Sequence, residues 1–267
     1  MKRASRKTDV SVIMPAYNAG RDILESILCV QAQTYRALEL LVIDDASSDD
    51  TWNIVERLAR DDARIRLMRN DANRGVSASR NRGIENARGR FLMFLDSDDL
   101  WERTKVETQV AFMREHECAV SYMDYMRFRD ANRDIAWLVT APEEITYRDL
   151  LASNDIGMLT AAVDRHNVFR LPTFKAQGHE DYTFWLDLMR DAPAPALKVP
   201  TPAPLACYRE RENSVSSNRL RSAVWHWNIL CAQKQALPRR CVLMAQYAWR
   251  ALNKRRLMRR YVSGMTR

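Results

Sequence analysis

The sequence lacks the marks of several protein classes. Its five cysteines form no C-x-x-C pair and have no paired histidines beside them. An odd, unpatterned set of thiols argues against a disulfide framework or a zinc site and favours the reducing environment of the cytosol. No segment reaches the roughly 18 uncharged apolar residues that a membrane-spanning helix needs, and the apolar run at residues 10–14 is too short for a signal peptide. We therefore expect a cytoplasmic protein that is not integral to a membrane.

Acidic residues are missing from one part of the chain. No aspartate or glutamate follows Glu212, and this tail carries twelve lysines and arginines. Of the 42 basic residues, 30 precede the tail beside all 34 acidic ones, so the formal net charge of +8 arises in the tail. A basic tail on a mildly acidic body is typical of a protein that meets a polyanionic surface.

Three interpretations of this tail stay open: an anionic membrane surface as partner, a solvated helical appendage, or an oligomer contact. No nucleic acid is expected, because the basic residues join no recognisable nucleic-acid-binding module.

The first hundred residues alternate apolar, strand-like runs with stretches of helical spacing. The predicted strands cover residues 10–14, 38–43, 65–68 and 91–95, and the predicted helices cover residues 23–32, 51–59 and 76–87. Strands that alternate with helices and show no polar alternation predict a parallel sheet covered on both faces. The fold class is therefore α/β.

The second part of the chain predicts a less regular arrangement. We expect a helix over 103–116, a strand or hairpin over 118–128, and a helix that opens within 178–186 with acids in its first turn. Five of the nine prolines fall between 193 and 204, which predicts an extended segment. Helices are expected over 219–236 and 240–262.

Polar residues follow three of the four predicted strands. They occupy residues 15–18, 44–47 and 96–99. Because ligands of open α/β sheets bind outside the carboxyl ends of the strands, these residues predict one site at one edge of the sheet.

Asp96 and Asp98 in the third of these segments are candidate metal ligands. Mg²⁺ and Mn²⁺ prefer oxygen ligands, commonly one or two carboxylates together with phosphate oxygens and water. The alternative is an Asp-rich turn that caps a helix starting near Leu100, and Asp99 fits such a cap. The position after a buried strand, opposite two other polar strand ends, favours the site.

Asp44 and Asp45 are candidates for hydrogen bonds from a nucleobase N–H or ribose hydroxyls. The alternative is capping of the helix at 51–59 by the residues that follow them, 47–49, and both roles are compatible. Tyr17 is a candidate for stacking on a base, and otherwise an ordinary half-buried tyrosine.

Four ordered motifs, at residues 10–18, 41–47, 75–84 and 89–99, resemble family 2 of the GT-A-fold glycosyltransferases. Sparser similarity covers 179–185 and 208–216. The resemblance implies a GT-A fold with a mainly parallel central sheet flanked by helices, and a metal-dependent transfer of a sugar from a nucleotide diphosphate, with UDP as the expected nucleotide. It divides the chain into a catalytic domain over 1–217, with a nucleotide-binding half at about 9–117 and an acceptor half at about 118–217, and a basic helical extension over 218–267.

The resemblance also implies roles for individual residues on the donor side. The nucleobase would contact Tyr17 and Asp45, with Pro15 nearby, and Arg80 would approach the diphosphate. Mn²⁺ or Mg²⁺ would bind Asp98 directly, and Asp96 would lie near the ribose or the metal. Arg209 or Arg211 would reach a phosphate.

On the acceptor side, Glu180 and Asp181 resemble the acidic pair of the inverting members, which makes Asp181 the candidate base. A carboxylate there would take the proton of the acceptor hydroxyl as its oxygen attacks the anomeric carbon. The alternative is a pair of acids at a helix N-terminus. For the neighbouring His179 a structural role outweighs metal or acceptor binding, and Trp185 is expected in the core.

The middle and end of the chain resemble the subgroup that builds teichuronic acid, capsule and lipopolysaccharide chains. The acceptor would then be a saccharide or lipid-linked saccharide at the inner face of the cytoplasmic membrane, where the protein would be peripheral. A nucleotidyltransferase-like enzyme is disfavoured, because neither G-x-x-x-x-G-K-[ST] nor G-x-G-x-x-G occurs. A non-catalytic nucleotide- or carbohydrate-binding relative is the other alternative.

Overall fold

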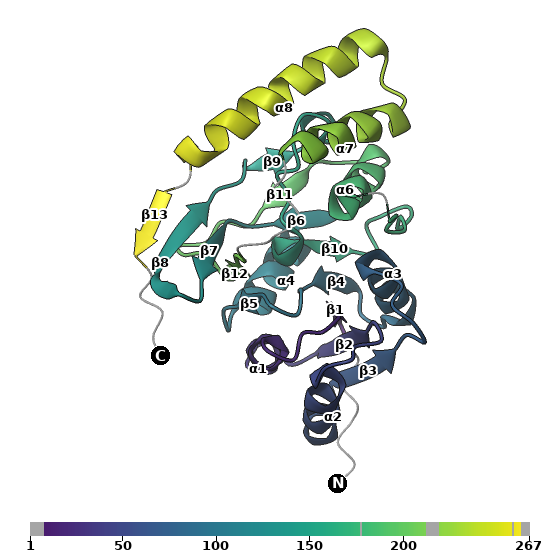
Figure 1. The fold of residues 1–267 in the computed structure, drawn as a ribbon, viewed down its shortest axis with the longest axis vertical. Coiled ribbons are helices and arrows are strands. Elements are labelled where there is room, and N and C mark those ends of the chain that lie inside the picture. The colour runs from purple at the N-terminus through teal and green to yellow at the C-terminus, as the bar shows by residue number, and fades with distance from the viewer. Residues whose placement is uncertain (1–7, 177, 212–218, 258, 263–267) are drawn as a thin grey trace.

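The computed structural model describes residues 8–176, 178–211, 219–257 and 259–262, and Figure 1 shows their arrangement. Four parallel strands form the first half of the main sheet in the order β3-β2-β1-β4. They are β1 (Val10–Ala16), β2 (Leu38–Asp44), β3 (Ile65–Arg69) and β4 (Phe91–Phe94). The predicted parallel sheet is confirmed for this half of the molecule.

Alternate residues of these strands enter two separate core clusters, one on each face of the sheet. On one face, Val12 and Met14 pack with α1 (Ile23–Gln31), α2 (Thr51–Asp61) and α4 (Lys105–Glu115). On the other, Ile13 and Ile43 lie under α3 (Val76–Asn86) and join the cluster of α6 (Glu180–Arg190). Burial on both faces is the reason that the strands read as continuous apolar runs.

Gly83 allows α3 to approach the sheet closely. A Cβ atom at this position would lie 2.5 Å from the Ile13 side chain, so any larger residue would push the helix away.

The second half makes the eight-stranded sheet mixed, although parallel pairs still outnumber antiparallel ones. β10 (Ala162–Asp164) runs antiparallel to both β4 and β6 (Val120–Tyr122). β11 (Ala196–Lys198) pairs parallel with β6 and antiparallel with β9 (Glu144–Ile145) at the edge. The rest of the segment 193–204 contains bends and no helix, as its prolines predict.

A second sheet of five strands, in the order β13-β8-β7-β12-β5, was not predicted. It contains β5 (Leu100–Trp101), β7 (Tyr125–Arg129), β8 (Asn132–Val139), β12 (Ala206–Arg209) and β13 (Arg259–Val262). Three expectations are corrected by it. Residues 118–128 form no hairpin, because β6 and β7 belong to different sheets. No helix starts near Leu100, since this residue pairs with Cys207 in β5 and α4 begins at Lys105. The helix expected over 240–262 ends at Leu257, and residues 259–262 pair antiparallel with β8.

The C-terminal helices lie against the second half of the molecule. α7 (Arg219–Ala232) lies beside α6 in Figure 1, and α8 (Leu237–Leu257) packs on α7. The short α5 (Tyr147–Leu150) also packs against α6. Ile229, Leu230 and Leu243 from α7 and α8 are buried in the same core cluster as α6. The two helices are thus part of the folded body through their apolar side chains.

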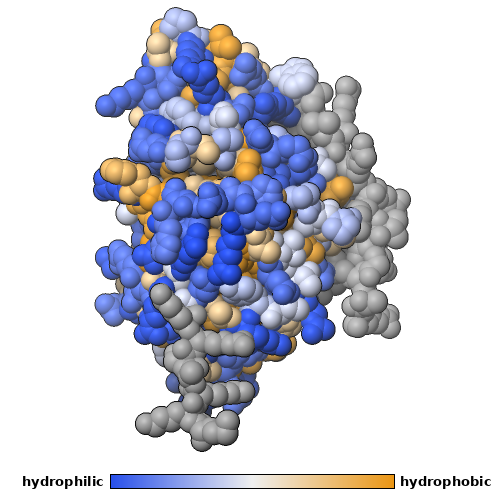
Figure 2. All heavy atoms as spheres, turned by 180° about the vertical axis from the view of Figure 1, so that it is seen from behind, coloured by the Kyte–Doolittle hydropathy of each residue, from blue (hydrophilic) through white to orange (hydrophobic). Residues whose placement is uncertain are grey.

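No helix in the described part of the chain is long and apolar enough to cross a membrane. The face seen in Figure 2 is mostly hydrophilic, with hydrophobic residues in small separate spots.

Candidate active site

The carboxyl ends of β1, β2 and β4 meet at one edge of the main sheet, as their polar residues predict. A cavity of about 230 Å³ opens there, and residues from all three strand ends line it. The loops are joined by hydrogen bonds, among them Asp45 N to the Ala16 carbonyl at 2.8 Å and Asn18 N to Ser47 Oγ at 3.0 Å. The lining consists of Pro15, Ala16, Tyr17, Asp45, Val76, Ser79, Asp96, Ser97 and Asp98.

Asp45 and Asp44 have different surroundings, although the sequence treats them as a pair. Asp45 lines the cavity and accepts hydrogen bonds from the backbone N–H groups of Arg74, at 3.0 Å, and Gly75, at 2.7 Å. Asp44 is fully buried, 3.1 Å from Arg69 Nε, and lies outside this lining. Of the two predicted residues, the structure brings only Asp45 to the cavity. Tyr17, 51% exposed, forms the outer part of the lining.

The capping alternative for this loop is also present, on a different residue. Asp49 accepts hydrogen bonds from the N–H groups of Thr51, at 3.1 Å, and Gly20, at 2.8 Å. It thereby joins the start of α2 to the loop after β1, which leaves Asp45 for the cavity.

Asp96 and Asp98 each face an arginine. Asp96 Oδ1 accepts a hydrogen bond from Arg80 at 2.7 Å, and Asp98 Oδ2 lies 3.1 Å from Arg211 Nε. Burial, and after it the negative charge of Asp96, raises the pKa of Asp98. A neighbouring cation would stabilise the ionised form of Asp98 and offset this effect.

The oxygen donors of this pair fit Mg²⁺ or Mn²⁺. Within the residues that the structure describes, no group of three His, Cys, Asp or Glu side chains is arranged to hold a metal ion. A complete cage of protein ligands is not needed, because these cations are commonly held by one or two carboxylates with phosphate oxygens and water.

Asp99 has a different role from the predicted helix cap. It is buried, it precedes a strand, and its Oδ1 accepts a hydrogen bond from Arg209 N at 2.9 Å. Burial, with the charges of Asp96 and Asp98, raises its pKa well above the usual range. Asp99 therefore ties β12 to the loop that carries the two candidate metal ligands.

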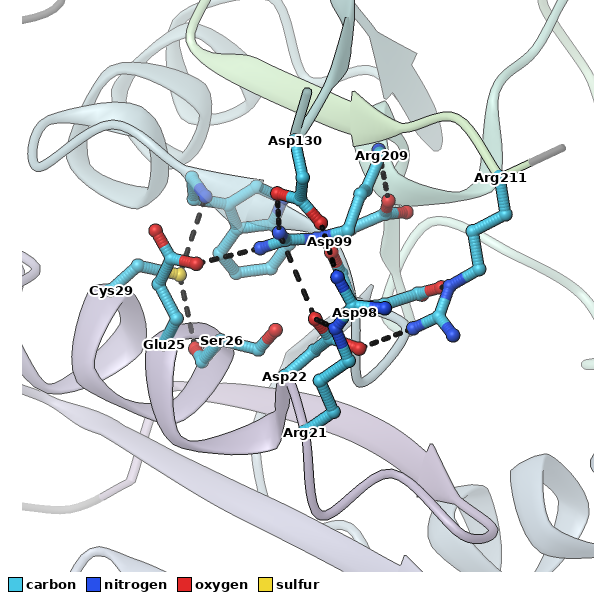
Figure 3. A network of polar contacts seen from close by, with 11 residues as sticks. Arg21, Asp22, Glu25, Ser26, Cys29, Asp98, Asp99, Asp130, Arg209 and Arg211 are labelled. Atoms are coloured by element: carbon cyan, nitrogen blue, oxygen red, sulfur yellow. Dashed lines mark hydrogen bonds and ion pairs between the residues drawn. The ribbon is translucent and has the colours of Figure 1, made fainter. Parts of the chain in front are cut away.

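Arg209 is the centre of the polar network in Figure 3. Its side chain is 3% exposed, and its Nε donates to the Asp98 carbonyl at 2.7 Å. Its guanidinium also forms ion pairs with Glu25, at 2.7 Å, with Asp130 and with Asp22. A buried guanidinium held by so many partners positions the Asp98 loop. It does not line the cavity at the strand ends.

Arg211 is the more accessible of the two predicted arginines. Its guanidinium bridges Asp98 and Asp22, and about half of its side chain is exposed. Of the two residues, Arg211 alone combines exposure with direct contact to the Asp98 carboxylate, and it is therefore the candidate for a phosphate.

A second cavity, of about 990 Å³, holds the predicted acidic pair. Glu180 and Asp181 both line it, and so does Asp96, which is shared with the smaller cavity. Asp181 Oδ2 accepts a hydrogen bond from Asn154 Nδ2 at 3.2 Å, and its Oδ1 accepts one from Tyr182 N at 2.8 Å. The two acids also stand in the first turn of α6, so the structure combines the helix-terminus position with exposure to the cavity.

Arg80 lies where the two cavities meet. Its side chain is buried, bonded to Asp96, and stacked over the Phe174 ring at 5.4 Å from the centroid. Burial opposes its charge, but Asp96, followed by Asp181 and Glu180, outweighs burial and raises the pKa of Arg80. A permanently charged guanidinium thus stands between the candidate metal ligands and the candidate base.

The larger cavity contains residues that the sequence reasoning did not single out. They come from the second sheet, from the loop after α5 and from the C-terminal helices, and include Tyr125, Arg127, Asn154, Tyr208, Trp225, His226, Tyr247, Trp249 and Arg250. Their chain positions are too scattered to form a motif. The one available signal is the aromatic content of the basic tail, for which the sequence leaves a membrane surface, a solvated appendage and an oligomer contact open. Trp185 is fully buried, as expected, and His179 lines the cavity with its ring edge-on to Trp225.

Comparison with known proteins places this geometry in a family. The family model described as Glycosyl transferase family 2 matches residues 11–175. TuaG of Bacillus subtilis, named for teichuronic acid biosynthesis, is 32% identical over 92% of this chain and 97% of its own length. WfgD of Escherichia coli, a UDP-Glc:alpha-D-GlcNAc-diphosphoundecaprenol beta-1,3-glucosyltransferase, is 38% identical over 83% of this chain and 85% of its own.

Two solved structures have the same GT-A fold. Staphylococcus aureus TarS residues 1–349 in complex with UDP gives a TM-score of 0.67 at 18% identity, covering 92% of this chain and 72% of that one. The mannosyltransferase PcManGT from Pyrobaculum calidifontis, in complex with GDP-Man and Mn²⁺, gives a TM-score of 0.67 at 21% identity, covering 92% and 70%.

Proposed function

The chain belongs to glycosyl transferase family 2, and we propose that it moves a sugar from a UDP-linked donor to a saccharide or lipid-linked saccharide during synthesis of a cell-surface polysaccharide. It is a glycosyltransferase of GT-A fold. The UDP-linked donor and the lipid-linked acceptor are supported by the names of similar proteins, among them WfgD for both and the UDP complex of TarS for the nucleotide.

One observation carries this proposal: Asp96 lines both cavities. The smaller cavity offers Tyr17 and Asp45 to a nucleoside, and the larger one offers Asp181 to an acceptor. A sugar that is joined to a diphosphate at Asp96 would therefore have its anomeric carbon facing the larger cavity. In such a transfer reaction the acceptor must lie on one side of the anomeric carbon and the leaving diphosphate on the other.

The chain's own residues supply three parts of the reaction. Arg80, buried and charged, stabilises the negative charge that develops on the leaving diphosphate. Asp181 accepts the proton of the acceptor hydroxyl while that oxygen attacks the anomeric carbon. Asn154 holds Asp181 through its amide N–H and so fixes the carboxylate for this role. Attack from the face opposite the diphosphate inverts the anomeric centre.

Asp98 would hold Mn²⁺ or Mg²⁺ directly, with Asp96 beside it. When bound, the cation would neutralise part of the negative charge on the diphosphate. Arg211, which contacts Asp98 in the structure, is the residue that would turn to a phosphate oxygen.

A thermal-shift panel of nucleotides tests the donor site. UDP is expected to raise the melting temperature only with Mn²⁺ or Mg²⁺ present, and UDP-sugars are expected to be hydrolysed slowly without an acceptor. Asp98→Asn should remove the metal-dependent shift. Asp71→Asn, which changes an exposed acid of the same half, should keep it. If no nucleotide diphosphate stabilises the wild-type protein in a metal-dependent way, the donor site is wrongly assigned.

Peripheral binding to an anionic membrane is a second part of the proposal. It is supported by the tail, which lacks acids beyond Glu212. The structure does not describe the side chains of Lys254, Arg255, Arg256, Arg259 and Arg260, so this part rests on the sequence. Changing these five residues to glutamine should release the protein from phosphatidylglycerol vesicles at low salt, while phosphatidylcholine vesicles should bind neither form. Unchanged sedimentation with phosphatidylglycerol would favour the solvated appendage.

A further inference from the structure

The C-terminal helices form one wall of the larger cavity. Trp225 and His226 from α7 line it together with Tyr247, Trp249 and Arg250 from α8. Glu180 and Asp181 at the start of α6 line the same cavity, together with Asp96. A ligand that fills the cavity would therefore touch both the candidate base and the helical extension. The volume of about 990 Å³ suits a ligand larger than a single small ion or water cluster.

The wall consists largely of aromatic side chains, and some polar atoms beside them have no hydrogen-bond partner among the described residues. The His226 ring is stacked between Tyr247, at a centroid distance of 4.2 Å, and Tyr182, at 5.6 Å. His226 is 1% exposed, and neither of its ring nitrogens has a hydrogen-bond partner among the described residues. Asn154 Oδ1, also in this cavity, is buried and lacks a partner within the same set of residues. The lining combines the exposed ring of Trp249 with the carboxyl groups of Glu180 and Asp181, which matches a ligand with apolar faces and polar edges.

The charges of the lining disfavour an anionic ligand. Each of its three arginines is paired with a carboxylate: Arg80 with Asp96 at 2.7 Å, Arg127 with Glu210 at 2.6 Å, and Arg250 with Asp155 at 2.8 Å. The lining holds five carboxyl groups against these three guanidinium groups. An anion would have to displace one of these carboxylates from its arginine and would also meet the remaining ones.

We infer that α7 and α8 form the wall of the acceptor subsite, and that this subsite binds an uncharged pyranoside whose C–H face contacts the ring of Trp249. The inference rests on the proposed function, because it makes Asp181 the base for this acceptor. A diphosphate on a lipid-linked acceptor lies outside the cavity. The hydroxyl groups at the edges of the pyranoside are the partners for Asn154 and for the acidic pair.

Trp249 is the residue on which to test this subsite. Its side chain is 66% exposed, so its truncation is expected to leave the melting temperature unchanged. Trp227 on α7 is the matched control, because it is also a tryptophan of the helical pair, stacks under Arg240, and lies outside the cavity lining. The test uses saturation-transfer NMR with UDP and diamagnetic Mg²⁺ present. The probes are the methyl glycosides of glucose, galactose, mannose, N-acetylglucosamine and N-acetylgalactosamine, with methyl glucuronide as the anionic counterpart.

Wild-type protein is expected to bind at least one uncharged glycoside and to bind methyl glucuronide much more weakly. Trp249→Ala should weaken the binding of that glycoside about tenfold, Trp249→Phe should retain most of it, and Trp227→Ala should bind as the wild type does. The inference is overturned if no uncharged glycoside binds, if the glucuronide binds equally well, or if Trp249→Ala and Trp227→Ala behave alike. The metal-dependent thermal shift with UDP, measured on the same samples, reports on the proposed function separately.

Discussion

The indole ring of Trp225 occupies the space that a side chain on Gly178 would need. A Cβ atom at Gly178 would lie 2.6 Å from Trp225 Cε2 and 2.7 Å from Cδ2. Gly178, with φ +72°, and His179, with φ +50°, both have left-handed backbone conformations directly before α6. Glycine adopts this conformation without cost, whereas in His179 it costs energy unless the surroundings hold it. Helix α7 therefore holds the turn that presents Glu180 and Asp181 to the larger cavity.

Gly178→Ala is expected to lower the free energy of unfolding by about 2–3 kcal/mol, because the methyl group meets the ring and alanine resists a positive φ. The rate of transfer should fall as well, since the Asp181 turn must move, while the UDP thermal shift stays unchanged. Gly75→Ala is the control for stability: its φ is +85°, but nothing lies within 4 Å of its Cβ position. The double variant Gly178→Ala/Trp225→Ala should regain the part of the free energy of unfolding that is lost through the clash between the methyl group and the indole ring. Equal costs for Gly178→Ala and Gly75→Ala would show that the ring contact is unimportant.

Asp181→Asn should reduce transfer by at least about a hundredfold, because the amide cannot accept the acceptor proton. The oxygen that accepts from Tyr182 N remains, so the fold and the UDP thermal shift should be preserved. Asp187→Asn on the same helix, whose carboxylate pairs with Lys175 and Arg190, is the control and should transfer sugar normally. Retained turnover in Asp181→Asn would exclude this residue as the base.

Arg209 and Arg211 should differ sharply when each is changed to glutamine. Arg209→Gln leaves Asp22, Glu25 and Asp130 facing one another without their buried cation, and we expect a loss of about 3–5 kcal/mol in the free energy of unfolding. Arg211→Gln removes a half-exposed contact and should cost less than about 1 kcal/mol, yet weaken UDP binding in a titration. If Arg209→Gln melts at the wild-type temperature, the network in Figure 3 does not hold the Asp98 loop.

His226 gives the protein a predictable response to acid. Burial, with the nearby His179, lowers the pKa of His226 from 6.5 to about 4. Between these two values the unfolded chain binds more protons than the folded one, so the free energy of unfolding falls as the pH is lowered through this window. The loss begins near 6.5 and is complete below about 4.

His226→Phe keeps a ring between Tyr182 and Tyr247 and removes the titrating group. The variant should lose less melting temperature than the wild type between about pH 7 and about pH 5. His116→Phe, at an exposed histidine, is the control and should follow the wild type. Identical pH profiles for wild type and His226→Phe would contradict the lowered pKa.

The first half of the fold follows from local sequence pattern. Strands β1, β2, β3 and β4 are short apolar runs separated by helices of regular spacing, and such units pair in parallel with their polar ends at one edge. This local logic is sufficient to bring Tyr17, Asp45, Asp96 and Asp98 around one cavity. The local pattern does not predict that Asp45 lines the cavity while Asp44 is buried away from it. The direction of a side chain at the end of a strand depends on the conformation of the loop that follows.

The second half could not be predicted in the same way. Strand β5 contains only two residues, and β12 pairs with both β5 and β7 across long stretches of chain. Strands this short carry no period of their own, and their pairing depends on contacts between distant residues. The expected helix at Leu100 was wrong for this reason, and the second sheet was missed.

By itself, the sequence determined the family, the α/β class, and the donor-side motif around Asp96 and Asp98, because these depend on residues close together in the chain. Tertiary structure alone decided that Arg209 is buried beneath the Asp98 loop, that Trp225 holds the turn before Asp181, and that α7 and α8 wall the larger cavity. Each of these contacts joins segments far apart in the chain, and such contacts exist only once the core has brought the two halves together.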